Sequence, residues 1–287
     1  MLVAGVGAVA VARIDAIARA AIERGATGAL GVPTSLESAD VGLLSGTFAL
    51  RGLRIANPEA FADTGEDFLR LGEGGVAVSL GTLRGDVIEL PHLRLADLAI
   101  DLQRRRGASN YGVILDHLNG ADGTEAGEPA DEGPGLIVRE VTIRDVRVRV
   151  SAAPIGGEPT VVTIPIQEIT LTDVGSEEPL PVGALAGVIV RAVLSTAVEQ
   201  GGALLPADLA SDLKGSLASL GPLSDLGVSV SADIGAEAER LLESAGAAAD
   251  RAVDEVTDKA KDAKKTLEDL GKGLLPGSKK KPTGGGN

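Results

Sequence analysis

The sequence predicts an α+β protein, mainly β, in which a curved antiparallel sheet follows an N-terminal helix and precedes a helical C-terminal region. Apolar and polar residues alternate with period two over most of 32–174, as is typical of strands with one buried face. Outside this region the apolar residues recur at helical spacing. The predicted parts are an N-terminal apolar helix or anchor (1–26), a β-groove domain with a short helix insert at 109–118 (27–175), a helical region (176–271) and a disordered basic tail (272–287).

Four segments share the pattern apolar-x-apolar-x-x-apolar-x-apolar. They are 48–55, 93–100, 141–148 and 164–171. In a regular strand the extra residue would turn every later apolar side chain to the wet face. A bulge or bend at the fifth position would absorb it, and Asp97, Asp145 or Glu168 there could bond exposed backbone N–H groups. The pattern therefore predicts a concave aliphatic groove lined by Leu50, Leu53, Leu95, Leu98, Ile143, Val146, Ile166 and Ile169.

Composition narrows the class of partner. Hydrophobic residues make up 44% of the chain but aromatic residues only 1%, so few side chains are available to stack on bases or sugars. The 27 basic and 41 acidic residues give a formal charge of -14, which repels phosphate backbones. We therefore expect no nucleic-acid partner. Because the chain has no Cys, disulfides and thiolate chemistry are excluded.

The sequence contains no pattern typical of a catalytic or metal-binding site, so we expect a protein that is not an enzyme. The two histidines, His92 and His117, are not at the spacing of a metal site, and no G-x-S-x-G turn is present. The string Gly5-x-Gly7-x-x-Ala10 copies a dinucleotide-binding turn, but the strand preceding it would be about four residues long, which is too short for that motif. We expect no catalytic residues, no cofactor and no metal.

The N-terminus begins with an uninterrupted apolar and Gly segment, Leu2–Ala12, followed by an amphipathic run. Eleven residues are fewer than the roughly 20 of a spanning helix and are closer to the apolar part of a signal peptide. No basic residue precedes them. Two interpretations stay open: an export signal or truncated membrane anchor, and an ordinary buried helix.

The last third is predicted to be helical. The segment 181–200 is apolar almost all round, which suits either a helix that covers the open sheet face or one that contacts a membrane. Residues 204–220 form a weaker amphipathic candidate, and 228–234 is a candidate final strand. An Ala-rich stripe over 236–270 fits a loosely docked helix, a membrane-surface helix or a coiled-coil partner.

Three segments give the sequence a resemblance to a known family. They are Gly31–Gly46 (GVPTSLESADVGLLSG), Leu53–Phe61 (LRIANPEAF) and Ser109-Asn110-Tyr111. Together they resemble the N-terminal module of AsmA-like proteins, which are related to the TamB group, over roughly 1–175. The resemblance implies a periplasmic protein of a diderm bacterium, anchored to the inner membrane by its N-terminus. It also implies an apolar β-groove that moves or organises phospholipid.

Two hypotheses follow. The first is a membrane-anchored envelope protein of AsmA-like type that binds phospholipid acyl chains in the groove and contributes to lipid transport or envelope organisation. The second is a non-enzymatic structural or interaction protein whose sheet face is filled by its own 181–200 helix. The expected partners are the phospholipid of the inner membrane and, as a second candidate, another envelope protein.

Overall fold

The computed structural model describes residues 2–42, 45–82, 85–105, 107–121, 134–152, 160–202, 204–236 and 238–244, with Ala247 and Lys261. The chain divides into two compact units, Met1–Leu242 and Glu243–Asn287. Every helix and strand named below belongs to the first unit. The basic tail predicted for 272–287 and most of the Ala-rich stripe lie outside the described residues.

The order of elements agrees with the α+β class that the sequence predicts. The helices are α1 (Leu2–Leu30), α2 (Asn110–Ala121), α3 (Val182–Gly201) and α4 (Ala207–Ala218), with short 3-10 turns η1 (Glu59–Thr64), η2 (Leu80–Thr82) and η3 (Leu223–Leu226). The strands are β1 (Thr34–Gly42), β2 (Thr47–Ala56), β3 (Asp67–Ala77), β4 (Val87–Arg105), β5 (Ala108–Ser109), β6 (Gly135–Ala152), β7 (Thr160–Val174) and β8 (Ser229–Asp233).

The strands form one open eight-stranded sheet in the order β1-β2-β3-β4-β6-β7-β8, with the short β5 paired to β4. All neighbours are antiparallel except β4 and β6, which are parallel. The predicted antiparallel sheet is thus confirmed for all neighbours but this parallel pair. The reason is the inserted helix: α2 lies in the connection that returns the chain to the starting end of the sheet, and parallel neighbours require such a crossover.

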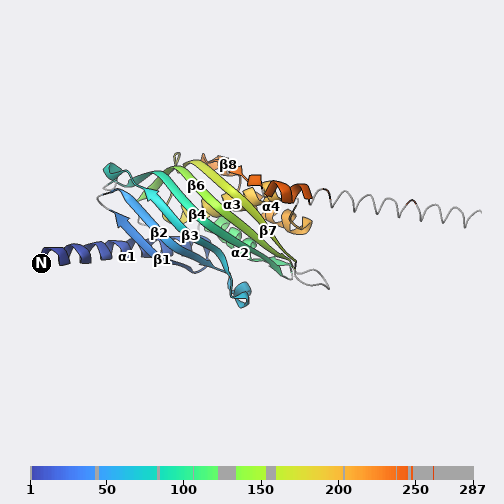
Figure 1. Cartoon of the computed structure of the whole chain (residues 1–287), viewed down its shortest axis with the longest axis horizontal. Coiled ribbons are helices and arrows are strands. Elements are labelled where there is room, and N and C mark those ends of the chain that lie inside the picture. Colours follow the sequence, from blue (N-terminus) through green and yellow to red (C-terminus); the bar gives the residue numbers. More distant parts are fainter. Residues whose placement is uncertain are drawn as a thin grey trace, which may run out of the picture. The chain divides into compact units, whose positions relative to one another are not determined.

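The helices cover one face of the sheet and leave the other polar. Figure 1 shows α2 and α3 behind the sheet, and α1 running beside the edge strand β1. One hydrophobic core joins the inner side chains of the strands to α2, α3, α4 and the C-terminal part of α1. The core is aliphatic as the composition predicts, with Phe61, Phe68 and Tyr111 as its fully buried aromatic side chains.

A single line across the sheet interrupts the alternation of every long strand. At this line each strand turns two consecutive residues outward, so that flanking inward positions are three residues apart instead of two. We call this line the crease; it contains Glu37, Gly52, Gly72, Asp97, Asp145 and Gln167. The flanking inward pairs are Leu36 and Ala39, Leu50 and Leu53, Leu71 and Gly74, Leu95 and Leu98, Ile143 and Val146, and Ile166 and Ile169.

The crease has a conformational basis in three strands. Gly52, Asp97 and Asp145 have φ values of 64°, 57° and 54°, in the left-handed region. Gly52 also lies close to β1, since a Cβ at this position would come within 2.6 Å of Glu37. Aspartate tolerates the left-handed region better than most residues because its side chain is short and polar. These residues occupy the fifth position of the sequence pattern, as predicted.

Of the two predicted alternatives, a bulge or a bend, the β-bulge was wrong. A bulge sets two residues of one strand against one of its partner and shifts the pairing. Here the pairing keeps its alignment across the crease: Leu36 faces Leu53 on one side, and Ser38 faces Arg51 on the other. Since every neighbouring strand makes the same step, no residue is left over. In β7 the step occurs without a left-handed residue. Neither Gln167, which lies on the crease, nor Glu168, the fifth residue of the pattern, has a positive φ.

Two of the three acidic side chains that were expected to bond backbone N–H groups, Asp97 and Glu168, contact arginines instead. Asp97 lies 3.9 Å from Arg147, and Arg144 donates a 2.8 Å hydrogen bond to Glu168. Within the described residues, neither carboxylate accepts a bond from a backbone N–H. All four side chains lie on the exposed face, so these contacts contribute little stability individually. The left-handed backbone, and not the carboxylate, accounts for the aspartates at this line.

We predict that the crease is sensitive to side-chain shape. Asp145→Val should lower the free energy of unfolding by roughly 1–2 kcal/mol, because a β-branched residue is strained at positive φ. Asp145→Gly should be neutral or stabilising, because glycine adopts this conformation freely. Urea denaturation of both variants measures the difference. Equal stability of the Val and Gly variants would contradict the left-handed crease.

Candidate functional site

The eight residues predicted to line a groove form two adjacent rows on the inner face of the sheet. Leu50, Gly74, Leu95, Ile143 and Ile169 are successive neighbours in one row. The second row lies across the crease and is formed by Leu53, Leu71, Leu98, Val146 and Ile166. The repeat pattern therefore identified side chains that share one face and lie side by side on four strands.

These rows are covered by the protein's own helices. Seven of the eight predicted side chains are at most 8% exposed, and Leu53 is partly buried against the same core. Val188, Val193 and Leu194 of α3 belong to this core. A Cβ at Gly201 would lie 2.7 Å from side-chain atoms of Ile164, so the C-terminal end of α3 packs tightly on β7. An acyl chain can reach the rows only if a covering helix moves. That they line a lipid groove stays a prediction.

Helix α3 has an unusual composition for a covering helix. It is the helix within the described residues that is long and apolar enough to cross a membrane, and 72% of the relevant stretch is buried inside the protein. Its one arginine, Arg191, is 6% exposed and donates hydrogen bonds to the carbonyl oxygens of Leu220 and Gly221. These bonds fasten α3 to the segment that follows α4. The sequence left open whether this helix covers the sheet or contacts a membrane, and the structure has it covering the sheet.

Helix α1 protects the outer edge of the sheet through polar side chains four residues apart. Asp15 accepts a 2.8 Å bond from the N–H of Val41, and Glu23 accepts one of the same length from Leu36. The hydroxyl of Thr27 accepts a bond from Thr34 N–H at 3.0 Å. Unpaired edge groups invite pairing with other chains, and these side chains occupy several of them. We call this contact the α1–β1 seam.

Glu23 is the residue of the seam whose pKa is changed by its surroundings. Its Oε1 accepts bonds from both the Leu36 N–H and the Arg19 guanidinium, at 2.8 and 2.9 Å. Partial burial alone would raise the pKa of this carboxyl, but the two hydrogen bonds and the charge of Arg19 together lower it. Glu23 is thus held in its charged form. Arg19 also donates a bond to the carbonyl oxygen of Glu37, where the crease reaches β1.

Sequence reasoning missed this seam, although a signal for it exists. Asp15, Arg19, Glu23 and Thr27 recur at every fourth position and therefore share one side of a helix. This polar stripe lies beside the apolar residues of the predicted amphipathic run that follows Ala12. What the sequence could not supply was its partner, because the N–H groups that it binds belong to an edge strand with no special composition.

The apolar N-terminal segment continues the same helix. Residues 2–12 are helical together with 13–30, so Gly5, Gly7 and Ala10 lie within a helix and not on the strand–turn–helix of a dinucleotide site. Figure 1 shows the N-terminal part of α1 projecting past the end of β1. Ile17, on the next turns, is 66% exposed. The C-terminal half of this helix is docked on the protein, and the export signal or membrane anchor stays a prediction for its N-terminal part.

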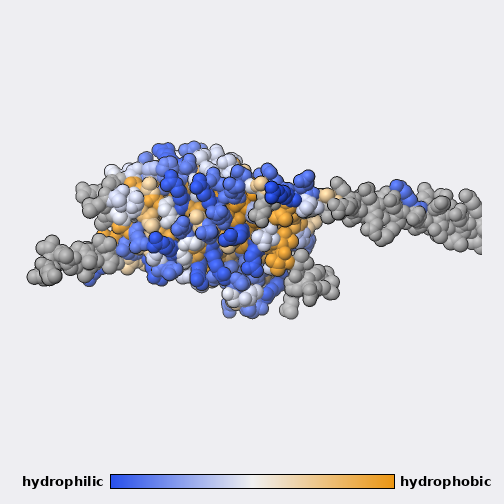
Figure 2. Space-filling model, in the orientation of Figure 1, coloured by the Kyte–Doolittle hydropathy of each residue, from blue (hydrophilic) through white to orange (hydrophobic). Residues whose placement is uncertain are grey.

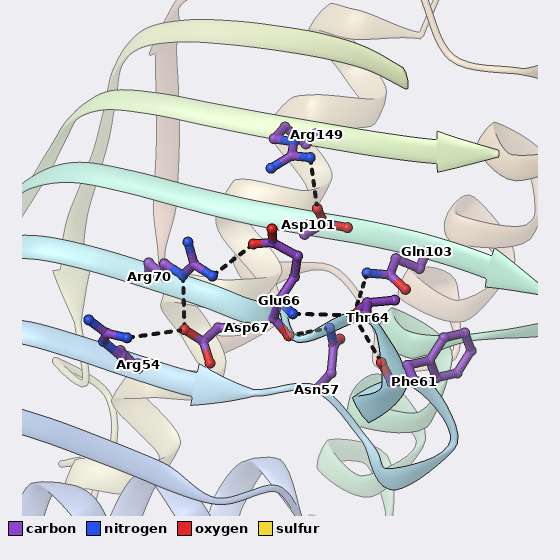
Figure 3. A network of polar contacts seen from close by, with 10 residues as sticks. All are labelled: Arg54, Asn57, Phe61, Thr64, Glu66, Asp67, Arg70, Asp101, Gln103 and Arg149. Atoms are coloured by element: carbon purple, nitrogen blue, oxygen red, sulfur yellow. Dashed lines mark hydrogen bonds and ion pairs between the residues drawn. The ribbon is translucent and has the colours of Figure 1, made fainter. Parts of the chain in front are cut away.

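Two of the segments that carry the family resemblance meet in a buried polar cluster. The amide of Asn110 donates 2.7 Å bonds to Asn57 Oδ1 and to the carbonyl oxygen of Asp101, and its Oδ1 accepts bonds from the N–H groups of Gln103 and Tyr111. Asn57 in turn donates to the carbonyl oxygen of Glu66. Figure 3 shows the part of this network around Asn57, in which η1 folds against β4. The Asn-Pro and Ser-Asn-Tyr strings therefore have a structural role.

A neighbouring cluster joins α4 to the start of α2. The Tyr111 hydroxyl donates a 2.8 Å bond to Asp212, and burial, together with this bond and the charge of Asp212, raises the pKa of Tyr111 well above its usual value. Arg104 donates a 2.6 Å bond to Asp208, and Arg105 binds Asp63. The side chains of Arg104 and Arg105 are therefore already neutralised by acidic residues. Arg106 lies outside the described residues.

Each of the two histidines contacts a single polar group in the described part of the chain. His92 is 3.4 Å from Glu140 on the exposed face, and His117 Nε2 lies 3.0 Å from the carbonyl oxygen of Gly28. Among the described residues, no three His, Cys, Asp or Glu side chains are grouped as metal ligands. What the described architecture offers is an aliphatic interior, a polar outer face and an apolar helical arm.

We predict that Glu23 makes the stability of the seam depend on pH. Because the folded pKa is lowered, its contribution is present above the unfolded pKa, about 4.3, and disappears as the pH falls through the folded value. Glu23→Gln should cost roughly 0.5–1 kcal/mol at pH 7, as a charged acceptor is replaced by a neutral one, and less in acid. Thermal unfolding of both proteins between pH 3 and 7 measures this. The exposed Glu178→Gln serves as control, and a pH-independent difference would contradict the assignment.

No protein-family model matches the chain, and no curated protein is significantly similar to it.

Proposed function

We propose that this protein is a membrane-anchored, non-enzymatic protein of the cell envelope, of AsmA-like type, which contributes to lipid transport or envelope organisation. In this proposal α1 holds the sheet domain at the periplasmic surface of the inner membrane. The observation that carries it is the construction of α1: one continuous helix with an apolar segment at its N-terminal end and hydrogen bonds to β1 along its C-terminal half. Because α1 is bound to β1, insertion of its apolar segment into a membrane would hold the whole sheet at that membrane.

Phospholipid is the proposed ligand of the aliphatic rows. Support comes from the continuity of these rows over five strands, β2, β3, β4, β6 and β7, and from the apolar character of α3, which suits a helix that exchanges contacts with the sheet for contacts with lipid. Apolar contact is worth about 25 cal/mol per Å² and needs no fixed polar groups, so the rows would select poorly among lipids. Binding in this mode requires displacement of α3.

The alternative is an interaction protein with a permanently filled sheet. The burial of the rows beneath α3 favours it, because a packed core has no free volume for an acyl chain. In this case the membrane serves only as the location, and the partner is another envelope protein. The acidic overall charge argues against nucleic acid in either case.

We predict that the apolar segment of α1 is required for membrane attachment. Purified protein should float with phosphatidylglycerol–phosphatidylcholine vesicles, and Val6→Lys with Val9→Lys should abolish flotation, because each lysine costs about 2.5 kcal/mol or more inside a bilayer. Val113→Lys and Val161→Lys replace exposed valines elsewhere and should float like the wild type. If the double lysine variant in α1 floats equally well, the anchor proposal fails.

A single disulfide can separate the lipid proposal from its alternative. A Cβ at Gly201 would lie 2.7 Å from Cγ2 of Ile164, which is bonded to Cβ of Ile164. Ile164→Cys removes this overlap, and together with Gly201→Cys it leaves two Cβ atoms at a separation compatible with the 3.8 Å or so typical of a disulfide. The natural chain has no Cys, so this bond forms alone. It locks α3 onto β7, and reduction releases it.

We predict that the reduced form takes up phospholipid from vesicles and the oxidised form does not, as measured by native mass spectrometry after re-isolation. Oxidised and reduced samples of one protein are matched in sequence and fold. Equal lipid content in both would place the lipid elsewhere than under α3. Lipid-free protein in both states, and in the wild type, would favour the interaction-protein alternative.

A further inference from the structure

The polar face of the sheet contains a hollow of about 360 Å³ over the middle of β2, β3, β4 and β6. The hollow exists because three outward residues of one transverse row are small: Ala49, Gly75 and Thr142. Gly75 contributes most, since a Cβ there would meet no atom within 4 Å. The crease adds Ala96 beside them on the next row. In Figure 2 this face shows hydrophilic side chains with hydrophobic surface between them.

Arginines from three strands surround this hollow. Arg94 belongs to the same row as Gly75, while Arg51 and Arg144 belong to the next row toward the crease. Glu73 is the one acidic residue in the lining, so the lining residues sum to a formal charge of +2 in a protein whose net charge is -14. Asp40 and Glu168, outside the lining, each contact one of these arginines, which leaves Arg94 as the arginine without an acidic partner among the described residues. An arginine without an acidic partner attracts anions locally.

The three arginines differ in how far they are neutralised. Arg144 binds Glu168 through its Nε at 2.8 Å, and Arg51 lies 3.8 Å from Asp40. Each of these leaves guanidinium N–H groups free for another acceptor, because a guanidinium has five. Arg94 makes no ion pair or side-chain hydrogen bond with any described residue. Its closest neighbours across the strands, Gly75 and Thr142, offer it no charge.

We propose that this hollow binds a small phosphate-bearing ligand, with Arg94 as the principal phosphate contact and Arg51 and Arg144 as additional donors. Guanidinium groups match the geometry of phosphate oxygens and bind them through two parallel hydrogen bonds. A volume of this size holds a small phosphate ester. The phosphate can belong to a free molecule or to a lipid headgroup. This inference concerns the polar face and does not depend on the proposed function.

The test uses the full chain and two probes. The amide signal of Gly75 is followed by NMR during titration with inorganic phosphate, at constant ionic strength. In parallel, the protein's affinity for vesicles of phosphatidylcholine is compared with that for vesicles containing one-half phosphatidylglycerol. The apolar arm contributes to both vesicle types, so the difference between them isolates the headgroup.

We expect Arg94→Gln to weaken binding about tenfold, which is the loss of one charge-assisted contact. Gly75→Leu should abolish binding by filling the hollow, and it should fold normally because the position has room and its φ is not positive. Glu73→Gln should strengthen phosphate binding by removing a like charge. Arg54→Gln is the matched control, because this arginine is on the same strand as Arg51 but beyond the crease.

The outcomes are distinguishable. A response to inorganic phosphate that Arg94→Gln weakens supports the site and a free phosphate ester as its ligand. A preference for phosphatidylglycerol that Arg94→Gln removes, without a response to inorganic phosphate, supports the site and a lipid headgroup. If neither probe distinguishes Arg94→Gln from Arg54→Gln, or if Gly75→Leu binds like the wild type, the proposal is overturned.

Discussion

The crease is the constraint on which the rest of this structure depends. A sheet with one buried face needs every strand to present its apolar side chains to the same side, and a step of one residue in a single strand would break that agreement. Here six strands make the step at the same level, so the agreement survives. Register, burial and the inner aliphatic rows all follow from this shared step. The row of small outward residues also follows from it, because the crease determines which residues of each strand face outward and which of them are neighbours.

The step was readable from the sequence in four strands and unreadable in two. Strands β2, β4, β6 and β7 have large aliphatic residues on both sides of it, which made the pattern visible. In β1 the second inward residue is Ala39, and in β3 it is Gly74, and neither carries an apolar side chain large enough to mark the face. The bulge interpretation failed for a related reason. A pattern in one strand does not reveal whether its neighbour has the same step, and only the pairing decides between a bulge and a crease.

Long-range polar contacts were also beyond the sequence. The positions of Asn57 and Asn110 are 53 residues apart, and nothing local indicates that one amide binds the other. The same holds for Tyr111 and Asp212. In contrast, the order of helices and strands followed from periodicity, because each element's pattern is complete within itself. The parallel pairing of β4 and β6 follows from the inserted helix once that helix is known to lie on the sheet and not beside it.

The two edges of the sheet differ in how far their backbone groups are occupied. At β1 the α1–β1 seam engages edge N–H groups, whereas β8 is short and exposed at all five residues. Strand β8 pairs with residues 168–172 of β7, and the stretch 160–167 of β7 continues the same edge without a strand beside it among the described residues. At the opposite edge, side chains of α1 already bind three N–H groups of β1. A strand from another chain would therefore find more free backbone groups at the β7–β8 edge than at β1, so the two edges differ in how readily they extend the sheet.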